Sequence, residues 1–278
     1  MAPELSLSVV RRGQGPKHLV FIHGFGGSRF TWRFWNDRFG PEYTLHLIDL
    51  KGFGTSARPE DGRYAPRDLA EEVVRYLIDS GLDDYALVGH SMGGGVALFS
   101  YLALKDRGAP LPGSIVLVAA AAYAQVIPNL ISLARRPLLG PLLLPIIPAR
   151  VLTRVGLNAA YHRERTPPAE AIDGYTKGLA SLRAKWSMRQ VAMRIVPADL
   201  EEITVRYRSI AVPTLLVWGR QDRVVPLWVG QRLMRELPDA DLVVLEDCGH
   251  MPAEEAPEAS FDAVERFFHS RWGSTPPK

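Results

Sequence analysis

Short runs of hydrophobic residues alternate along the chain with longer stretches in which hydrophobic positions recur every three or four residues. This alternation is typical of parallel strands joined by crossover helices. Most of the short runs are nearly continuous in Val, Leu and Ile, as expected for strands covered on both faces. We therefore predict an α/β fold with a mostly parallel central sheet, its strands at residues 18–22, 43–48, 85–88, 115–118, 214–218 and 242–245, with an earlier strand within 5–10.

The stretches between these runs predict helices that flank the sheet. The clearest begins at Pro66, because proline suits the first position of a helix and Asp68 suits its positive N-terminus. Leu69, Val73 and Leu77 then recur at a spacing of four and mark one buried face. The same reasoning predicts helices at 28–38, 92–105, 227–237 and 257–268.

One segment breaks the alternation. Residues 123–210 contain no clear strand, several prolines and patches of helical periodicity. We interpret this segment as a helical cap inserted between two strands of the sheet. Residues 1–122 and 211–278 would then form the core.

The cap segment contains an apolar run at 138–147 that is interrupted only by glycine and proline. This run suggests a small apolar acyl or aromatic substrate, with Leu139 and Leu143 as candidate binding residues. A simpler interpretation is that cap helices need an apolar underside to pack on the core. Arg135 and Arg136 could bind a carboxylate or a lipid headgroup, or could belong to an ordinary solvated surface.

The charge composition points away from nucleic acid as a partner. Lys and Arg number 33 against 30 Asp and Glu, giving a formal charge of +3 with no long run of like charge. Cys248 is the only cysteine, which excludes an intramolecular disulfide and every C-x-x-C motif. Residues 1–15 lack the apolar core of a secretory signal, and the longest apolar stretch, 115–134, contains Gln, Pro and Asn. We expect a cytoplasmic protein without a membrane span.

The pentapeptide GHSMG at residues 89–93 matches the pattern G-x-S-x-G. In that pattern the serine occupies a strained turn between a strand and a helix, and small neighbours allow the backbone to pass very close. The match alone is weak, but here a predicted strand ends at position 88 and a predicted helix follows directly. Ser91 is therefore the candidate nucleophile, and a glycine-rich packing turn is the alternative.

A serine hydroxyl becomes a good nucleophile only when a base removes its proton. His250 is the best candidate, because it follows the strand at 242–245 and would emerge at the same sheet edge as Ser91. Asp222 follows the preceding strand and is the candidate acid that orients the histidine. Glu246 and Asp247 are closer to His250 in sequence and stay as alternatives.

The tetrahedral intermediate of acyl transfer needs two fixed N–H donors for its negative oxygen. The backbone N–H of Met92 is one candidate because it follows the nucleophile. The loop HGFGG at residues 23–27 follows the first parallel strand and offers the N–H of Phe25 as the second. An ordinary glycine-rich turn is the alternative for this loop.

Five motifs now stand in one order along the chain: HGFG at 23–26, DLKGFGTS at 49–56, GHSMGG at 89–94, WGRQD at 218–222 and GH at 249–250. Together they resemble the α/β-hydrolase superfamily over nearly the whole chain, and most of all its small serine esterases, C–C bond hydrolases and monoacylglycerol-lipase-like members. Lys51 departs from the Pro or His that is usual there. Ser91 argues against the related epoxide hydrolases and haloalkane dehalogenases, which carry aspartate at that position.

The resemblance implies an α/β-hydrolase fold and a catalytic triad of Ser91, Asp222 and His250. It also implies a hydrolase of carboxylic esters or related acyl substrates that works through an acyl-enzyme on Ser91 and needs neither a cofactor nor a metal. A cofactor-free perhydrolase (haloperoxidase) and a C–C bond hydrolase would use the same triad. A non-catalytic ligand-binding homologue is the alternative outside enzymes, and the oligomeric state stays open.

Overall fold

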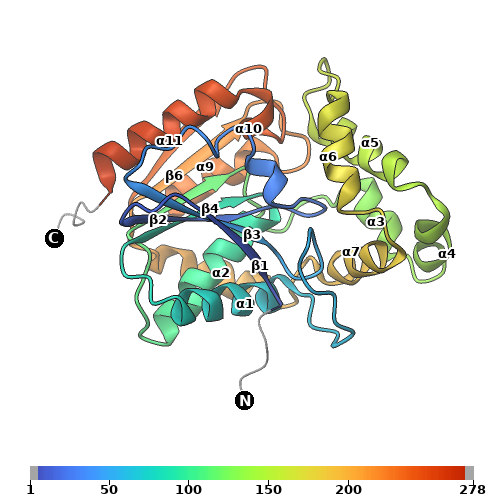
Figure 1. Cartoon of the computed structure of the whole chain (residues 1–278), viewed down its shortest axis with the longest axis horizontal. Coiled ribbons are helices and arrows are strands. Elements are labelled where there is room, and N and C mark those ends of the chain that lie inside the picture. Colours follow the sequence, from blue (N-terminus) through green and yellow to red (C-terminus); the bar gives the residue numbers. More distant parts are fainter. Residues whose placement is uncertain (1–5, 273–278) are drawn as a thin grey trace.

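The computed structural model describes residues 6–272. Its strands form one sheet in the order β1-β3-β2-β4-β5-β6-β7 (Figure 1), and only β1 runs antiparallel to its neighbour. The predicted first strand begins at Ser8, and position 5 lies outside the described residues. The strands are β1 (Ser8–Arg12), β2 (Lys17–Ile22), β3 (Tyr43–Asp49), β4 (Tyr85–His90), β5 (Ser114–Val118), β6 (Thr214–Gly219) and β7 (Ala240–Leu245).

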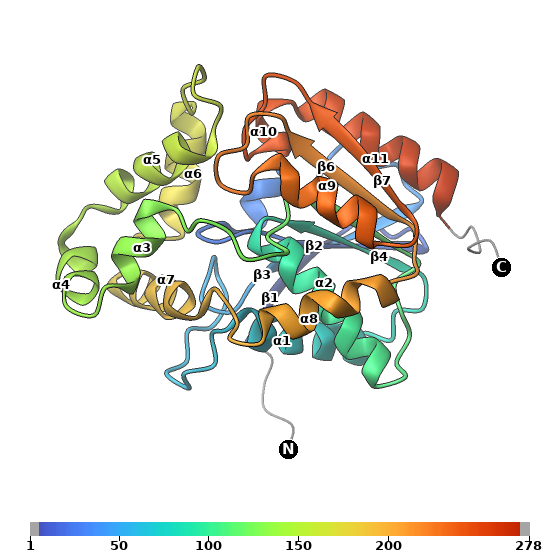
Figure 2. The same ribbon diagram turned by 180° about the vertical axis from the view of Figure 1, so that it is seen from behind.

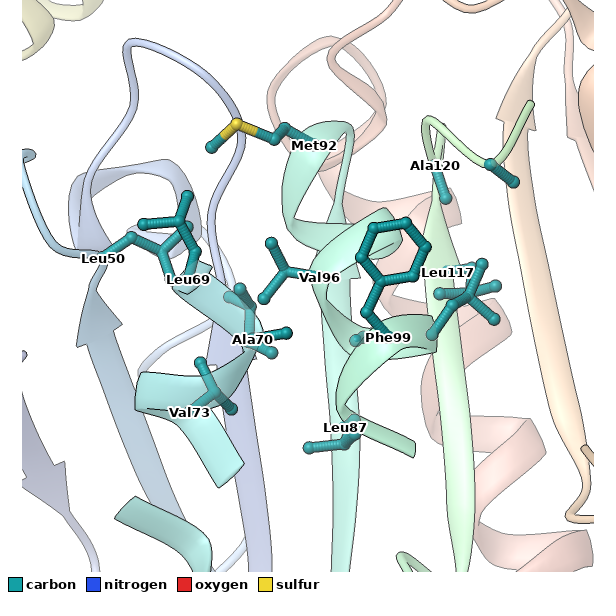
Figure 3. Close-up of a cluster of buried hydrophobic side chains, with 14 of the residues drawn as sticks. Leu50, Leu69, Ala70, Val73, Leu87, Met92, Val96, Phe99, Leu117 and Ala120 are labelled. Carbon is teal, nitrogen blue, oxygen red and sulfur yellow. The ribbon is translucent and has the colours of Figure 1, made fainter. Parts of the chain in front are cut away.

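Helices cover both faces of the sheet, which confirms the predicted fold class. One layer contains α1 (Pro66–Asp79), α2 (Met92–Asp106) and α9 (Leu227–Glu236). The other contains α11 (Pro257–Arg271) and, on the loop after β2, the 3₁₀ helix η1 (Arg29–Trp32). Consecutive residues of a strand point to opposite faces, and in β4 Leu87 accordingly joins the first layer while Ala86 and Val88 join the second. Figure 3 shows part of the first layer, with Val73 of α1, Val96 of α2 and Leu87 of β4 in the same buried cluster.

The helix predicted at 28–38 is wrong. The chain there forms only η1 and then a series of turns, with hydrogen bonds from Thr31 N to Ser28 O (3.0 Å) and from Trp35 N to Trp32 O (2.9 Å). In a 3₁₀ turn, side chains three residues apart lie one above the other. This geometry buries Trp32 and Trp35 together in the layer beside α11.

Between β5 and β6 the chain contains helices and no strand. Figure 2 shows α3 to α7 grouped at one end of the molecule, whereas α8 lies beside the core helices. Lys105 of α2 donates a hydrogen bond to the carbonyl of Ser209 (2.7 Å), which fastens the end of this segment to the core. The elements are α3 (Asn129–Arg135), α4 (Leu139–Ile146), α5 (Ala149–Ala160), α6 (Ala169–Lys177), α7 (Leu182–Arg194), α8 (Leu200–Val205) and η2 (Arg206–Ser209).

Within residues 6–272 no single helix is long and apolar enough to cross a membrane; α4 and α5 meet that length and hydropathy only together, and they are bent by 110° at the break between them.

Candidate active site

Ser91 lies at the junction of β4 and α2 in a backbone conformation that non-glycine residues rarely adopt, with φ 55° and ψ −124°. Such a residue carries on the order of 1–3 kcal/mol of strain and needs support from its surroundings. The Ser91 N–H donates to the carbonyl of Val118 in β5 (2.9 Å), and its own carbonyl accepts from Gly94 N (2.9 Å). A Cβ at Gly93 would stand only 2.3 Å from the carbonyl oxygen of Ile22 in β2. The small residues of the motif therefore allow the tight turn that presents Ser91.

Ser91, His250 and Asp222 form a chain of hydrogen bonds. His250 Nε2 lies 2.8 Å from Ser91 Oγ, and His250 Nδ1 lies 2.8 Å from Asp222 Oδ2. An ionised carboxylate can only accept, so Nδ1 donates to Asp222 and Nε2 is left free to accept the serine proton. The other carboxylate oxygen, Asp222 Oδ1, accepts from the N–H groups of Val224 and Val225, both at 2.8 Å. The structure thus brings together the three predicted residues from the carboxyl ends of β4, β6 and β7.

Within residues 6–272, neither alternative acid forms a hydrogen bond with the His250 ring. Glu246 has a side chain that is 62% exposed and pairs with Arg220 at 2.6 Å. Asp247 occupies a left-handed turn with φ 50°, and the hydrogen bond to Nδ1 is made by Asp222 instead. Cys248 is fully buried, and burial raises the pKa of its thiol, so it is a neutral core residue.

The main chain of His250 is fixed from two sides. Its N–H donates to the carbonyl of Ala160 at the end of α5 (2.7 Å), and its carbonyl lies 2.8 Å from His90 Nε2. Burial, followed by the charge of His250, lowers the pKa of His90 to about 3. His90 is therefore neutral at physiological pH and donates its Nε2 proton to that carbonyl.

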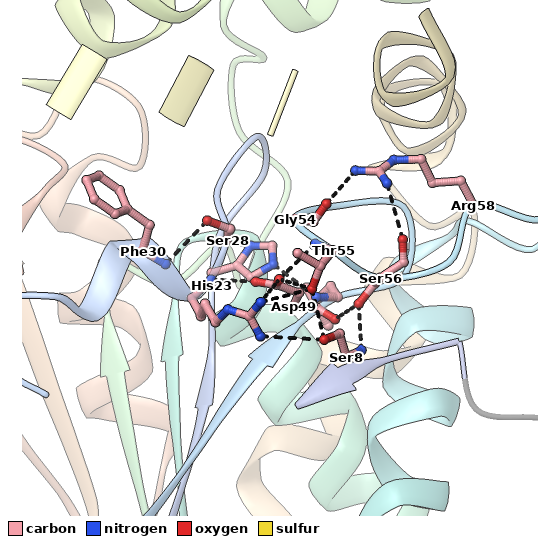
Figure 4. Close-up of polar contacts among 11 residues, drawn as sticks. Ser8, His23, Ser28, Phe30, Asp49, Gly54, Thr55, Ser56 and Arg58 are labelled. Atoms are coloured by element: carbon pink, nitrogen blue, oxygen red, sulfur yellow. Dashed lines mark hydrogen bonds and ion pairs between the residues drawn. The ribbon is translucent and has the colours of Figure 1, made fainter. Parts of the chain in front are cut away.

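The loop after β2 carries Phe25 and is held by its own network. Leu50 N donates to His23 Nε2 (3.0 Å), which leaves His23 Nδ1 as the donor to the carbonyl of Gly24 (2.8 Å). Figure 4 shows the adjoining contacts, in which Asp49 accepts from the backbone N–H groups of Arg29 (2.7 Å) and Thr55 (2.9 Å). No backbone hydrogen bond is formed by the N–H of Phe25 or Met92 within residues 6–272. Both amides lie on residues that line the cavity beside Ser91.

Ser91 and His250 face a cavity of about 540 Å³. Its wall contains Phe25 and Met92 of the core. The rest is formed mostly by apolar residues of the cap segment, including Ile127, Leu130, Ile131, Leu152, Leu157, Leu179 and Met188. Within residues 6–272, no group of three or more His, Cys, Asp or Glu side chains is arranged to hold a metal ion.

Leu139 and Leu143, the substrate contacts expected from the sequence, do not line this cavity. Both belong to α4, which lies at the outer edge of the cap segment in Figures 1 and 2. Leu144 and Gly140 form the buried side of this short helix, and Leu139 is 38% exposed. Apolar residues therefore occur on the exposed side of α4 as well as on its buried side.

Comparison with known proteins now identifies the family. The model of the alpha/beta hydrolase family matches residues 19–263. The chain belongs to this family. It is 29% identical over 254 residues to the uncharacterized hydrolase YugF of Bacillus subtilis, covering 91% of this chain and 90% of the relative. It is 28% identical to the pimeloyl-[acyl-carrier protein] methyl ester esterase of Aeromonas hydrophila, covering 95% and 99%.

A solved structure of an alpha/beta hydrolase fold protein from Burkholderia ambifaria superposes with a TM-score of 0.80 at 23% identity, covering 93% of each chain. This likeness confirms the fold.

Sequence reasoning missed one residue of this alpha/beta hydrolase that holds the histidine loop. Glu255 is 5% exposed, and its Oε1 accepts from the N–H groups of Gly249 (3.1 Å) and Met251 (3.0 Å), on either side of His250. Its Oε2 accepts from the N–H of His162, just beyond α5 (2.7 Å). The sequence shows a carboxylate five positions after His250, but nothing in it distinguishes Glu255 from the neighbouring Glu254 as the residue that holds this loop.

We expect Glu255→Ala to lower kcat about 100-fold while KM changes little. Three backbone donors would lose a charged acceptor, and a shift of about 1 Å in a catalytic group costs on the order of 10²-fold. Steady-state kinetics with a soluble ester tests this, with Glu258→Ala, an exposed residue of α11, as the matched control. An unchanged kcat in Glu255→Ala would show that the loop needs no such support.

Proposed function

We propose that this protein is a serine hydrolase that cleaves carboxylic esters with an apolar acyl group through an acyl-enzyme on Ser91. The observation that carries the proposal is the unbroken hydrogen-bonded chain from Ser91 through His250 to Asp222 beside an apolar cavity. The kinship with an esterase of Aeromonas hydrophila supports the same class of reaction.

In the first half of the proposed reaction, His250 Nε2 takes the proton of Ser91 as Oγ attacks the ester carbonyl carbon. The N–H groups of Phe25 and Met92 would bind the oxygen that becomes negative. The tetrahedral intermediate then collapses, the carbon–oxygen bond to the alcohol breaks, and the imidazolium gives its proton to the departing alkoxide.

In the second half, a water molecule takes the place of the alcohol. His250 removes its proton, the hydroxide attacks the acyl carbon, and Ser91 leaves with the proton that the histidine returns. Asp222 accepts the Nδ1 hydrogen bond throughout and stabilises the imidazolium in both halves.

Labelling with a fluorophosphonate probe tests the nucleophile directly. Wild-type protein should take up the probe covalently at Ser91, and Ser91→Ala should not react. Ser100→Ala, which removes a buried hydroxyl from the same helix, serves as the control and should label like wild type. Equal labelling of Ser91→Ala and wild type would refute the assignment.

A panel of p-nitrophenyl esters from acetate to octanoate tests the acyl preference. Each methylene buried in the apolar cavity contributes about 0.8 kcal/mol, so kcat/KM should rise about three- to fourfold per methylene until the cavity is filled. A flat or falling series would argue against an apolar acyl site. Faster turnover of acetate with hydrogen peroxide than of any ester would favour a perhydrolase.

A further inference from the structure

Large hydrophobic side chains gather on the outer surface of the cap segment. Among residues 6–272, seven of the fifteen exposed large hydrophobic side chains fall within residues 126–155. Isolated exposed hydrophobic residues are ordinary, but a gathering of them marks an interaction site. These are Val126 (90% exposed), Leu138 (82%), Leu139 (38%), Leu142 (65%), Ile146 (72%), Val151 (49%) and Val155 (50%).

The gathered residues come from α4, α5 and the loops beside α3. Figures 1 and 2 show from opposite sides that α4 is at the outer edge of the molecule, away from the sheet. No part of the core comes near enough to cover Leu138, Leu142 and Ile146, which stay more than half exposed. We call this surface of α3, α4 and α5 the outer cap face.

The charged residues of the same stretch of sequence are all arginines. Residues 123–163 contain five arginines and no aspartate or glutamate, although the whole chain has a formal charge of only +3. All five arginines are exposed. Arg150 pairs with Asp173 of α6, whereas Arg135, Arg136 and Arg154 form no ion pair with any residue of the part that the structure describes.

The outer cap face shares two residues with the wall of the cavity. Val126 and Val155 belong to the exposed apolar set and also line the cavity that contains Ser91. Leu130 of α3, which lies between these two residues in the sequence, also lines the cavity. An apolar chain that enters from the outer cap face would therefore meet hydrophobic side chains along its way.

We propose that the outer cap face docks on an anionic lipid surface, with the opening of the cavity turned toward the lipid. Aliphatic side chains that protrude beside arginines match the boundary between acyl chains and negatively charged headgroups. A second copy of this chain is a poor occupant, because a twofold interface would bring the unpaired arginines of the two copies together. An acidic protein would satisfy the arginines but offers no counterpart for the protruding leucines.

Vesicle flotation tests the proposal with wild-type protein. Vesicles of phosphatidylcholine with about one third phosphatidylglycerol should bind the protein, and vesicles of phosphatidylcholine alone should bind it much less. Arg135→Gln with Arg136→Gln should weaken binding about 25-fold, since each arginine near an anionic surface contributes about fivefold. Arg208→Gln with Arg266→Gln removes two exposed arginines elsewhere and should leave binding unchanged.

The apolar part is tested by Leu142→Gln with Ile146→Gln, which should weaken binding about tenfold or more, against Val205→Gln, a 70% exposed control on α8. Turnover of a water-soluble acetate ester should be unchanged in all of these variants.

Ser91→Ala should bind vesicles like wild type, so failure of the proposed reaction and failure of the lipid proposal are separate results. No binding to anionic vesicles, or equal binding by wild type and both cap variants, would overturn the proposal. So would a dimer in sedimentation that Leu142→Gln with Ile146→Gln dissociates.

Discussion

Replacement of Asp222 by asparagine should lower kcat for ester hydrolysis by about four orders of magnitude, as in other triads, without unfolding the protein. The reason lies in the two N–H groups of Val224 and Val225, which both point at Asp222 Oδ1 at 2.8 Å. In the variant they hold the amide oxygen at that position, so the amide nitrogen faces His250 Nδ1. That nitrogen donates, which forces Nδ1 to accept and places the ring proton on Nε2. The histidine then has no lone pair for the Ser91 proton.

The measurement is single-substrate kinetics on Asp222→Asn beside Asp247→Asn, the matched amide variant in the adjacent loop. Asp247→Asn should change kcat less than about threefold. Thermal unfolding of the two variants should be similar to that of wild type, because aspartate and asparagine have nearly the same shape. A loss of less than about tenfold in Asp222→Asn would mean that another acid orients His250.

The sequence predicted the sheet because its strands are buried on both faces and therefore read as continuous apolar runs. β4 is the clearest case, since every residue from Tyr85 to His90 is buried. The residues now found side by side at the carboxyl ends of β4, β6 and β7 could also be predicted. Parallel strands end at one edge of a sheet, so position after a strand is enough to group Ser91, Asp222 and His250.

Features that depend on packing between distant segments were not predictable in the same way. An apolar helix such as α4 carries no local sign of which side will be covered, and Leu139 and Leu143 were consequently expected in the cavity that they do not line. Trp32 and Trp35 fit a helix as well as a 3₁₀ turn. Arg33 pairs with Glu254 across 221 positions of sequence, a separation at which periodicity carries no information.

The Glu254 carboxylate joins the core to two helices of the cap segment. Its side chain is fully buried and accepts two hydrogen bonds from Arg33, at 2.8 and 2.9 Å. It also accepts from the hydroxyl of Tyr161 at the end of α5 (2.6 Å) and from the hydroxyl of Tyr175 in α6. Burial, together with the charge of Glu254, raises the pKa of both tyrosines, so both hydroxyls stay protonated as donors.

Glu254→Leu should therefore lower the free energy of unfolding by about 3–5 kcal/mol, because it leaves the Arg33 guanidinium, only 13% exposed, without its carboxylate partner and removes an acceptor from the hydroxyls of Tyr161 and Tyr175. For a chain of this size that corresponds to a fall in Tm of about 10 °C. Urea unfolding measures the loss, and Glu258→Leu on the surface of α11 is the control. Arg33→Leu with Glu254→Leu should lose less than the sum of the single variants, since no buried charge is then left alone.

Additive losses in that cycle, or a loss below about 1 kcal/mol in Glu254→Leu, would mean that the four groups do not act together. If they do, disrupting them should impair the geometry of the site around His250 as well as lower the stability of the fold. Glu254 is followed directly by Glu255, which holds the backbone on either side of His250, and Tyr161 adjoins Ala160, whose carbonyl accepts the His250 N–H at 2.7 Å. Glu254→Leu should consequently lose ester hydrolysis several degrees below its own unfolding temperature, whereas wild type should lose both together.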